Sequence, residues 1–438
     1  MKRRKSIIVE TAGVFGARAV FFVVGLISSI IINRTLGAEG RGVFAILLLY
    51  PDLLFMLFSF GMGEASAFNI GKKVFSDERV FAGIITASLV AGAVVLLFGA
   101  GLYELLRVAQ FKGIGFGMFM FSLARMPLYF FFRFMDYFFI GRTEIGRRNA
   151  LIVVQITSYL VFIVLFLLTG RLNVFGAVAT VNLSYLVVCL YALFSAAKSV
   201  RPAFAGVAGV LAESVKFGLK QQLASILIWA VTFGNYFMIK YYLDSEAVGL
   251  FAVASAVISM VWMFPEAVGL IAFARSSVQS EKESNASIPK MLRSALFLCL
   301  GAIVGAGLVC PLLVPLIYGA DFKPSVRLIF FMLPSSLGYL CFNMLLNDLR
   351  ARGIPLLAVP VLLIAIAFNF SFNILFLKSM GNIAAAANSS LTFILLAAGI
   401  LITYKRHSQV SYGELLILRK ADVAAIVDFA KRKLIKRD

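Results

Sequence analysis

The chain has 438 residues, of which 61% are apolar and only 14% are charged. A soluble protein of this length cannot hide so much apolar surface, so the composition excludes a water-soluble fold and predicts a membrane protein. The net charge of +20 does not indicate nucleic-acid binding, because the basic residues lie mainly between apolar runs and at the two ends.

The apolar runs predict an all-α polytopic membrane protein. They are continuous rather than alternating, which favours helices over a membrane barrel. The first run follows a basic stretch and is too long for a secretory signal, so we interpret it as a retained span. At about 20 residues per crossing, twelve transmembrane helices are expected, near residues 11–32, 43–68, 80–103, 114–140, 150–169, 174–196, 214–239, 248–273, 291–317, 326–347, 354–377 and 382–404.

A repeat divides the predicted helices into two sets of six. Residues 36–45 (LGAEGRGVFA) reappear 207 positions later as residues 243–252 (LDSEAVGLFA), and the same offset pairs Pro127 with Pro334. One register that holds across most of each half indicates a duplicated unit. In a membrane chain such a duplication predicts two matching helix bundles, related by a pseudo-two-fold axis, with a substrate path between them.

The duplication predicts an N-terminal bundle at residues 1–200, a C-terminal bundle at 201–408 and a tail at 409–438. In the tail, apolar side chains recur at helical spacing among Lys and Arg. This pattern is typical of a basic amphipathic helix lying on anionic membrane lipids, and a frayed basic tail is the alternative. About three times as many Lys and Arg lie at the N-terminus, in even-numbered loops and in the tail as in odd-numbered loops. We therefore expect both termini in the cytoplasm, at a prokaryotic plasma membrane.

Arginines inside the predicted spans are the leading candidates for substrate binding, because charge at membrane depth is costly. Arg18 lies in the first span, and Arg125 and Arg133 lie in the fourth. At about 100° per residue, Asp136 shares one arc of the fourth helix with both of its arginines. Pro127 is expected to kink this helix beside Arg125. We expect the three arginines to line a hydrated cavity and to bind an anionic headgroup.

Carboxylates supply the competing interpretation. Arg133 and Asp136 are three residues apart and can neutralise each other, and Asp52 or Glu64 of the second span can pair with arginines of other helices. The same three carboxylates, Asp52, Glu64 and Asp136, are the candidates for coupling transport to a gradient of H⁺ or Na⁺.

Two further lysines near the start of the seventh span, Lys216 and Lys220, either add charge to the cytoplasmic side of the cavity or snorkel to the interface. No catalytic residue, metal site or bound cofactor is expected. The four cysteines lie in apolar runs without a CxxC spacing, and the single histidine, His407, is in the tail.

The two halves differ in their intramembrane charge. The 207-residue shift sends Arg125 to Met332 and Arg133 to Leu340. The shared scaffold therefore does not need these arginines, and we place the main headgroup contacts in the N-terminal half.

Residues 33–45, their weaker echo at 240–252 and the twelve-span pattern resemble polysaccharide (O-antigen type) flippases. These belong to the multidrug/oligosaccharidyl-lipid/polysaccharide exporter superfamily, which also holds the multidrug and toxin extrusion transporters. The resemblance implies two six-helix bundles around a V-shaped, alternately exposed central cavity. It implies as substrate an undecaprenyl-pyrophosphate-linked oligosaccharide repeat unit, moved from the cytoplasmic to the outer leaflet. Polysaccharide assembly proteins are further candidate partners.

The residues agree with that implication, because the planar fork of Arg donates two parallel hydrogen bonds to phosphate. A drug/cation antiporter of the same fold is the alternative, and it would need a mainly acidic cavity. A membrane polymerase or glycosyltransferase would need a large outer loop or a catalytic carboxylate motif, neither of which the sequence contains, so we predict a transporter rather than an enzyme.

Overall fold

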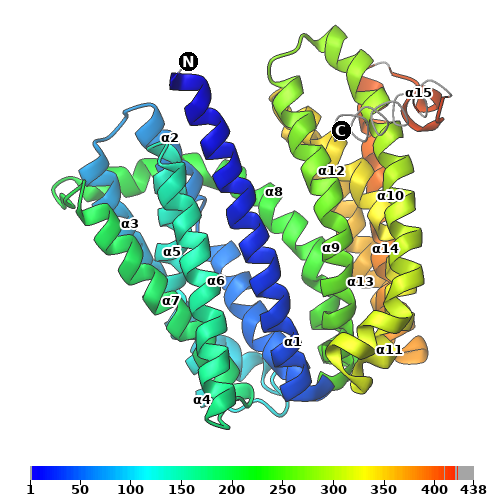
Figure 1. The fold of residues 1–438 in the computed structure, drawn as a ribbon, viewed down its shortest axis with the longest axis horizontal. Coiled ribbons are helices and arrows are strands. Elements are labelled where there is room, and N and C mark those ends of the chain that lie inside the picture. The colour runs from blue at the N-terminus through cyan, green and yellow to red at the C-terminus, as the bar shows by residue number, and fades with distance from the viewer. Residues whose placement is uncertain (1, 409, 420–421, 423–438) are drawn as a thin grey trace, which may run out of the picture. The chain divides into compact units, whose positions relative to one another are not determined.

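A computed structural model describes the backbone of residues 2–408, 410–419 and 422 and, from Gly16 onward, their side chains except those of residues 220, 221 and 355. Every regular element in this part of the chain is a helix, as predicted, and the chain divides into two compact units between Ile226 and Leu227 (Figure 1). The first unit contains α1 (Lys2–Phe58), α2 (Met62–Gly71), α3 (Asp77–Leu106), α4 (Phe116–Leu123), α5 (Met126–Gly141), α6 (Ile145–Leu168), α7 (Val174–Ala197) and the first part of α8 (Val207–Tyr242). The second contains the rest of α8, α9 (Ser245–Ser276), α10 (Glu281–Tyr318), η1 (Ala320–Phe322), α11 (Lys323–Met332), α12 (Ser335–Ala351), η2 (Pro355–Ala358), α13 (Val359–Met380), α14 (Asn382–Ser408) and α15 (Tyr412–Leu416).

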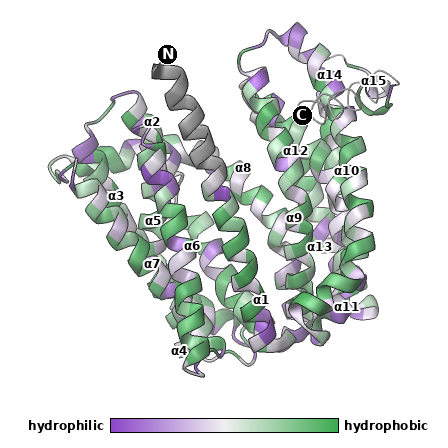
Figure 2. Cartoon of the chain, viewed as in Figure 1, coloured by the Kyte–Doolittle hydropathy of each residue, from purple (hydrophilic) through white to green (hydrophobic). Residues whose placement is uncertain are grey.

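Apolar residues, green in Figure 2, predominate along the helices, as in a multi-pass membrane protein. Within the described residues, nine helices are long and apolar enough to cross a bilayer, and the pair α11 and α12, bent by 53°, makes a tenth. Two features account for the difference from twelve. Helix α1 joins the first two predicted spans, and the fourth is split between α4 and α5. With these included, each unit has six spans.

The boundary between the units lies inside a helix. The sequence placed it at residue 200, in the longest predicted loop, whereas α8 runs unbroken from Val207 through Ile226 to Tyr242. The helix that follows this loop is therefore longer than the seventh span predicted from the sequence.

The repeated segment opens a helix in both units, by different means. In the second unit Asp244 is the N-cap of α9, and its side chain accepts a hydrogen bond from the backbone N–H of Ala247 at 2.7 Å. The matching residue of the first unit is Gly37, with φ 64° and ψ −176°. Only glycine adopts this conformation readily. Gly37 is the one non-helical residue of α1, so the first span passes into the second without a loop.

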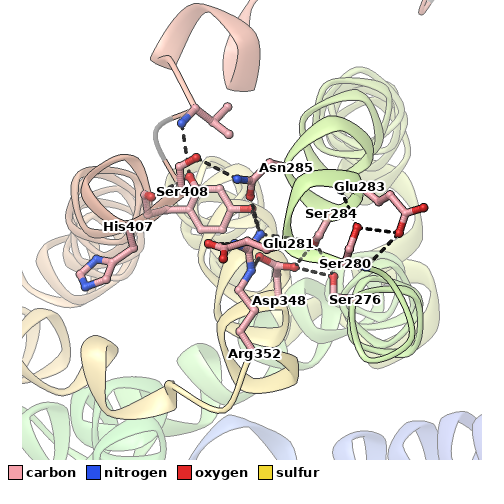
Figure 3. Close-up of polar contacts among 12 residues, drawn as sticks. Ser276, Ser280, Glu281, Glu283, Ser284, Asn285, Asp348, Arg352, His407 and Ser408 are labelled. Atoms are coloured by element: carbon pink, nitrogen blue, oxygen red, sulfur yellow. Dashed lines mark hydrogen bonds and ion pairs between the residues drawn. The ribbon is translucent and has the colours of Figure 1, made fainter.

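The second unit is closed at one end by a buried polar cluster (Figure 3). Asp348 of α12 is completely buried and accepts hydrogen bonds from Ser276 of α9 and Ser284 of α10. Its other oxygen lies 2.8 Å from Nε of Arg352, whose guanidinium also donates a hydrogen bond to the hydroxyl of Tyr404 of α14 at 3.0 Å. One ion pair therefore ties four helices together.

Candidate functional site

The site begins at a break in the fourth span of the first unit. Helix α4 ends at Leu123 and α5 begins at Met126, with Pro127 in its first turn. Proline has no N–H to donate, so it suits the first turn of a new helix better than the middle of a long one. Arg125 stands at the break, only 3% exposed, and its guanidinium donates to the carbonyl of Ser122 at 2.9 Å. The kink predicted beside Arg125 is confirmed as a full interruption.

A cavity of about 540 Å³ adjoins this break, entirely within the first unit. Helices α1, α5, α6 and α7 contribute its walls. The side chains that line it are Ala17, Arg18, Phe21, Leu48, Asp52, Arg125, Tyr129, Phe132, Arg133, Asp136, Arg148, Asn149, Ile152, Gln155, Ile156, Tyr159, Val181 and Tyr185. All three arginines expected at a headgroup site, together with two of the three candidate carboxylates, thus line one cavity.

The carboxylates do not neutralise the three arginines. Asp136 pairs with Arg148 of α6, at 2.9 Å between Oδ1 and Nε, rather than with Arg133 on its own helix. None of the ion pairs within 4 Å among the described side chains involves Arg18, Arg125 or Arg133. The pairing of Arg133 with Asp136, one of the two interpretations from the sequence, is therefore not present.

Asp52 is the carboxylate with the most direct electrostatic interaction with the three arginines. The charges of Arg125 and Arg133 both act on it, and the side chain of Tyr129 also interacts with it. Four arginines and two aspartates line the cavity, which leaves a formal excess of two positive charges. A cavity with this balance favours an anionic ligand.

Aromatic side chains surround the polar groups of the site. Tyr185 of α7 contacts Tyr129 and Phe132, with ring centroids 5.2 Å and 5.5 Å away. Arg133 extends over the ring of Phe55, with Cζ 5.4 Å from the centroid, and its Nε is buried without a hydrogen-bond partner. A buried donor without a partner is costly unless a ligand or water satisfies it.

Glu64 lies outside this cavity. It lines a neighbouring cavity of about 150 Å³, where the hydroxyl of Tyr137 donates to its carboxylate at 2.8 Å. Arg133 lines both cavities. Glu64 is thus separated from the other candidate carboxylates by the side chain of Arg133.

Of the two lysines predicted at the cytoplasmic side, the structure describes the side chain of only one. Lys216 is exposed on α8 and lines neither cavity. The side chain of Lys220 lies outside the described residues, as does most of the predicted tail helix. Within the described part of the tail, Asp422 accepts hydrogen bonds from Arg293 of α10 at 2.6 Å and 3.0 Å.

Sequence reasoning missed the contribution of α6. Arg148 was assigned to a loop, but it lies in the first turn of α6 and shares a wall with Gln155 and Tyr159. These residues recur at i, i+7 and i+11, which is a helical stripe. That spacing was visible in the sequence and could have identified a polar face on the fifth span.

In the second unit, a network of uncharged polar side chains lies at the place that corresponds to this site in the 207-residue repeat. The side-chain carbonyl of Asn235 accepts hydrogen bonds from Asn373 at 2.7 Å and from Asn388 at 3.2 Å, and Asn369 donates to Thr392 at 3.2 Å. All five residues are buried. Thr392 is the counterpart of Tyr185 in the 207-residue register. The excess positive charge of the first unit's cavity is therefore not repeated at the corresponding place in the second unit.

Comparisons with known proteins agree with this architecture. The family model described as "Polysaccharide biosynthesis protein" matches residues 31–327. No curated protein matches the chain significantly. An inward-facing multidrug resistance MATE family transporter of the MOP superfamily is 13% identical, with a TM-score of 0.71 over 89% of this chain and 95% of that one.

Two further solved structures share the fold. The lipid II flippase MurJ, in an inward closed conformation, is 14% identical with a TM-score of 0.70, over 91% of this chain and 87% of that one. A MOP superfamily transporter from Pyrococcus furiosus, described as having a binding pocket of reversed polarity, is 14% identical with a TM-score of 0.59, over 93% and 96%. Because the family model spans well over half of the sequence, the chain belongs to the polysaccharide biosynthesis protein family, and it has the fold of MOP-superfamily transporters.

Proposed function

We propose that this protein is a flippase that moves an undecaprenyl-pyrophosphate-linked oligosaccharide repeat unit from the cytoplasmic to the outer leaflet of a prokaryotic plasma membrane. Arg18, Arg125 and Arg133 hold the pyrophosphate. The observation that supports this role is that three guanidinium groups line one cavity of the first unit, with no carboxylate of the described side chains within 4 Å of any of them.

The chemistry of the cavity suits this headgroup. Guanidinium groups bind phosphate oxygens with paired, charge-assisted hydrogen bonds. A volume of about 540 Å³ lies within the range of pockets that enclose small ligands. The hydroxyls of Tyr129, Tyr159 and Tyr185 are available to sugar hydroxyls, and the prenyl chain remains in the lipid. Alternating exposure of the cavity to the two sides would carry the headgroup across.

The drug/cation antiporter is less well supported. A cationic substrate would meet a lining with two excess positive charges, and like-charge contact opposes binding. Direct transport of a cationic dye by proteoliposomes, unaffected by Arg125→Gln, would favour that alternative.

The test is leaflet transfer of a lipid-linked glycan by the purified protein in proteoliposomes. Single Arg18→Gln, Arg125→Gln and Arg133→Gln variants should each lower transfer by about tenfold or more, since a hydrogen bond to a charged group contributes about 1.5–3 kcal/mol. Arg107→Gln is the matched control, because Arg107 is largely exposed beside Glu104 and far from the cavity lining. Full transfer by all three correctly folded variants would contradict the proposal.

We also propose that transport is coupled to a proton gradient through Asp52. Protonation of Asp52 would remove one negative charge from the cavity lining and so strengthen anion binding. The polar residues that share the lining with Asp52 include Arg18, Arg125, Arg133, Arg148, Tyr129 and Tyr185. Transfer should increase with a pH gradient, and the Asp52→Asn variant should be insensitive to it. Glu64→Gln serves as the control, since Glu64 lies in the neighbouring cavity. A response to a Na⁺ gradient alone would rule out this coupling.

A further inference from the structure

A second basic cavity lies in the second unit, between α9 and α10. Its volume is about 630 Å³, and its lining contains Arg275 and Lys290. On α10 the lining residues recur at helical spacing, and on α9 Ile271 and Arg275 are one turn apart. The lining residues are Ile271, Arg275, Glu283, Ala286, Ser287, Lys290, Met291 and Ser294. Two neighbouring helices thus form the walls of one groove, which we call the α9–α10 groove.

The cations of this groove are available to a ligand. Arg275 and Lys290 are exposed, and neither takes part in an ion pair among the described residues. The one carboxylate in the lining is engaged elsewhere. Glu283 accepts hydrogen bonds from the backbone N–H of Ser280 at 2.9 Å and from its hydroxyl at 2.8 Å, as the capping box of α10 (Figure 3).

The groove has apolar side chains beside its cations. Ile271 and Met291 line it together with Arg275 and Lys290. Exposed apolar side chains continue on both helices, at Leu270, which is 56% exposed, and at Leu298, which is 46% exposed. Cations beside an apolar surface match a phospholipid, whose glycerol carries an anionic phosphate headgroup and two acyl chains.

We propose that the α9–α10 groove binds an anionic phospholipid of the surrounding membrane. Arg275 and Lys290 hold its headgroup phosphate, and an acyl chain lies along Ile271 and Met291. This site is separate from the arginine cavity of the first unit and does not depend on which substrate is transported. It is also distinct from the lipid contact expected of the basic tail.

Native mass spectrometry of the full-length protein in detergent tests the proposal, with phosphatidylglycerol as the probe. The Arg275→Gln/Lys290→Gln variant should bind at least about tenfold less phosphatidylglycerol, in keeping with the loss of two cations that attract anionic lipid. Lys282→Gln is the matched control. This variant removes one positive charge from α10 without altering the groove lining, and it should bind phosphatidylglycerol normally. Thermal unfolding of each variant establishes that the fold is retained.

Three results would overturn the proposal. The double variant could bind phosphatidylglycerol as the parent does. Zwitterionic phosphatidylcholine could bind as tightly as phosphatidylglycerol, which would indicate an apolar surface without headgroup recognition. Millimolar glycerol 3-phosphate could displace the lipid, which would identify a site for a soluble anion. The single Arg275→Lys variant refines a positive result, because it keeps the charge at the C-terminal turn of α9 but removes the planar fork.

Discussion

Arg148 shows how one residue determines which other charges are available. Its pairing with Asp136 leaves Arg133 without a carboxylate partner, although Asp136 is only three residues away on the same helix. The sequence predicts that these charges share one face of the fourth span, but it cannot choose between two arginines as partners. That choice depends on how the first turn of α6 packs against α5.

Removing Arg148 should therefore weaken substrate binding indirectly. In the Arg148→Gln variant, Asp136 loses its partner and is free to attract Arg133, so affinity for the lipid-linked pyrophosphate should fall by about tenfold. Adding Asp136→Asn should restore much of it. The measurement is substrate affinity in a double-mutant cycle. If the double variant binds no better than Arg148→Gln alone, Arg148 contacts the substrate itself.

The buried cluster of the second unit gives a second prediction at this scale. Arg352→Gln would leave Asp348 charged and completely buried, which should lower the free energy of unfolding by about 3–5 kcal/mol. Glu281→Gln removes the other acidic partner of Arg352. Because the side chain of Glu281 is 69% exposed, its loss should cost less than about 1 kcal/mol. Thermal unfolding in detergent should separate the two variants clearly, and equal stabilities would mean that the cluster is not a structural tie.

At the scale of helices, the first part of α8 is fixed to the first unit by a contact between two glycines. A Cβ atom built on Gly218 would lie 2.0 Å from the carbonyl oxygen of Phe60, and one built on Gly61 would lie 2.5 Å from Cα of Gly218. Gln222, one turn further along α8, donates to the backbone carbonyl of Met56 and to the hydroxyl of Ser59. Helix α8 therefore satisfies polar groups at the break between α1 and α2.

Gly218→Ala should therefore destabilise the protein by about 1–3 kcal/mol or more, since the added methyl group meets backbone and no flexible side chain can move aside. Gly209→Ala, on the same helix with nothing within 4 Å, should be neutral or slightly stabilising, by up to about 1 kcal/mol. Unfolding temperatures of the two purified variants provide the measurement. A stable Gly218→Ala protein would show that this crossing is loose.

Most of the helices could be predicted from the sequence, because apolar runs of about 20 residues have few alternatives in a bilayer. The interruption at Arg125 could be predicted from Pro127, and the repeat indicates that Pro334 does the same between α11 and α12. Two features could not be predicted. Gly37 replaces an expected loop by a single residue. The boundary between the units falls inside α8 rather than at residue 200. Neither feature is marked by an apolar run.

At the scale of the molecule, the two units share a frame but not their charges. The first has the arginine cavity, and at the corresponding place the second has a closed network of asparagines. The sequence predicted this asymmetry correctly, because an offset of 207 residues compares the halves directly. It could not indicate what replaces the arginines, since those asparagines come from three helices that only folding brings together.

The proposed orientation in the membrane can be tested with single cysteines. The four native cysteines are buried, so they should react slowly with a membrane-impermeant maleimide. Lys112→Cys, in an odd-numbered loop, should be labelled in intact cells, whereas Lys198→Cys, in an even-numbered loop, should react only after permeabilisation. Labelling with the opposite pattern would place both termini outside the cytoplasm.

The single residue between the first two spans also constrains how the protein can move. Arg18 and Asp52 lie on the two helical arms of α1, which are joined through the single non-helical residue Gly37. With only one residue between the arms, we expect a tilt of one arm to move the other. Lengthening this turn by a few flexible residues should therefore uncouple the two arms while leaving each of them intact.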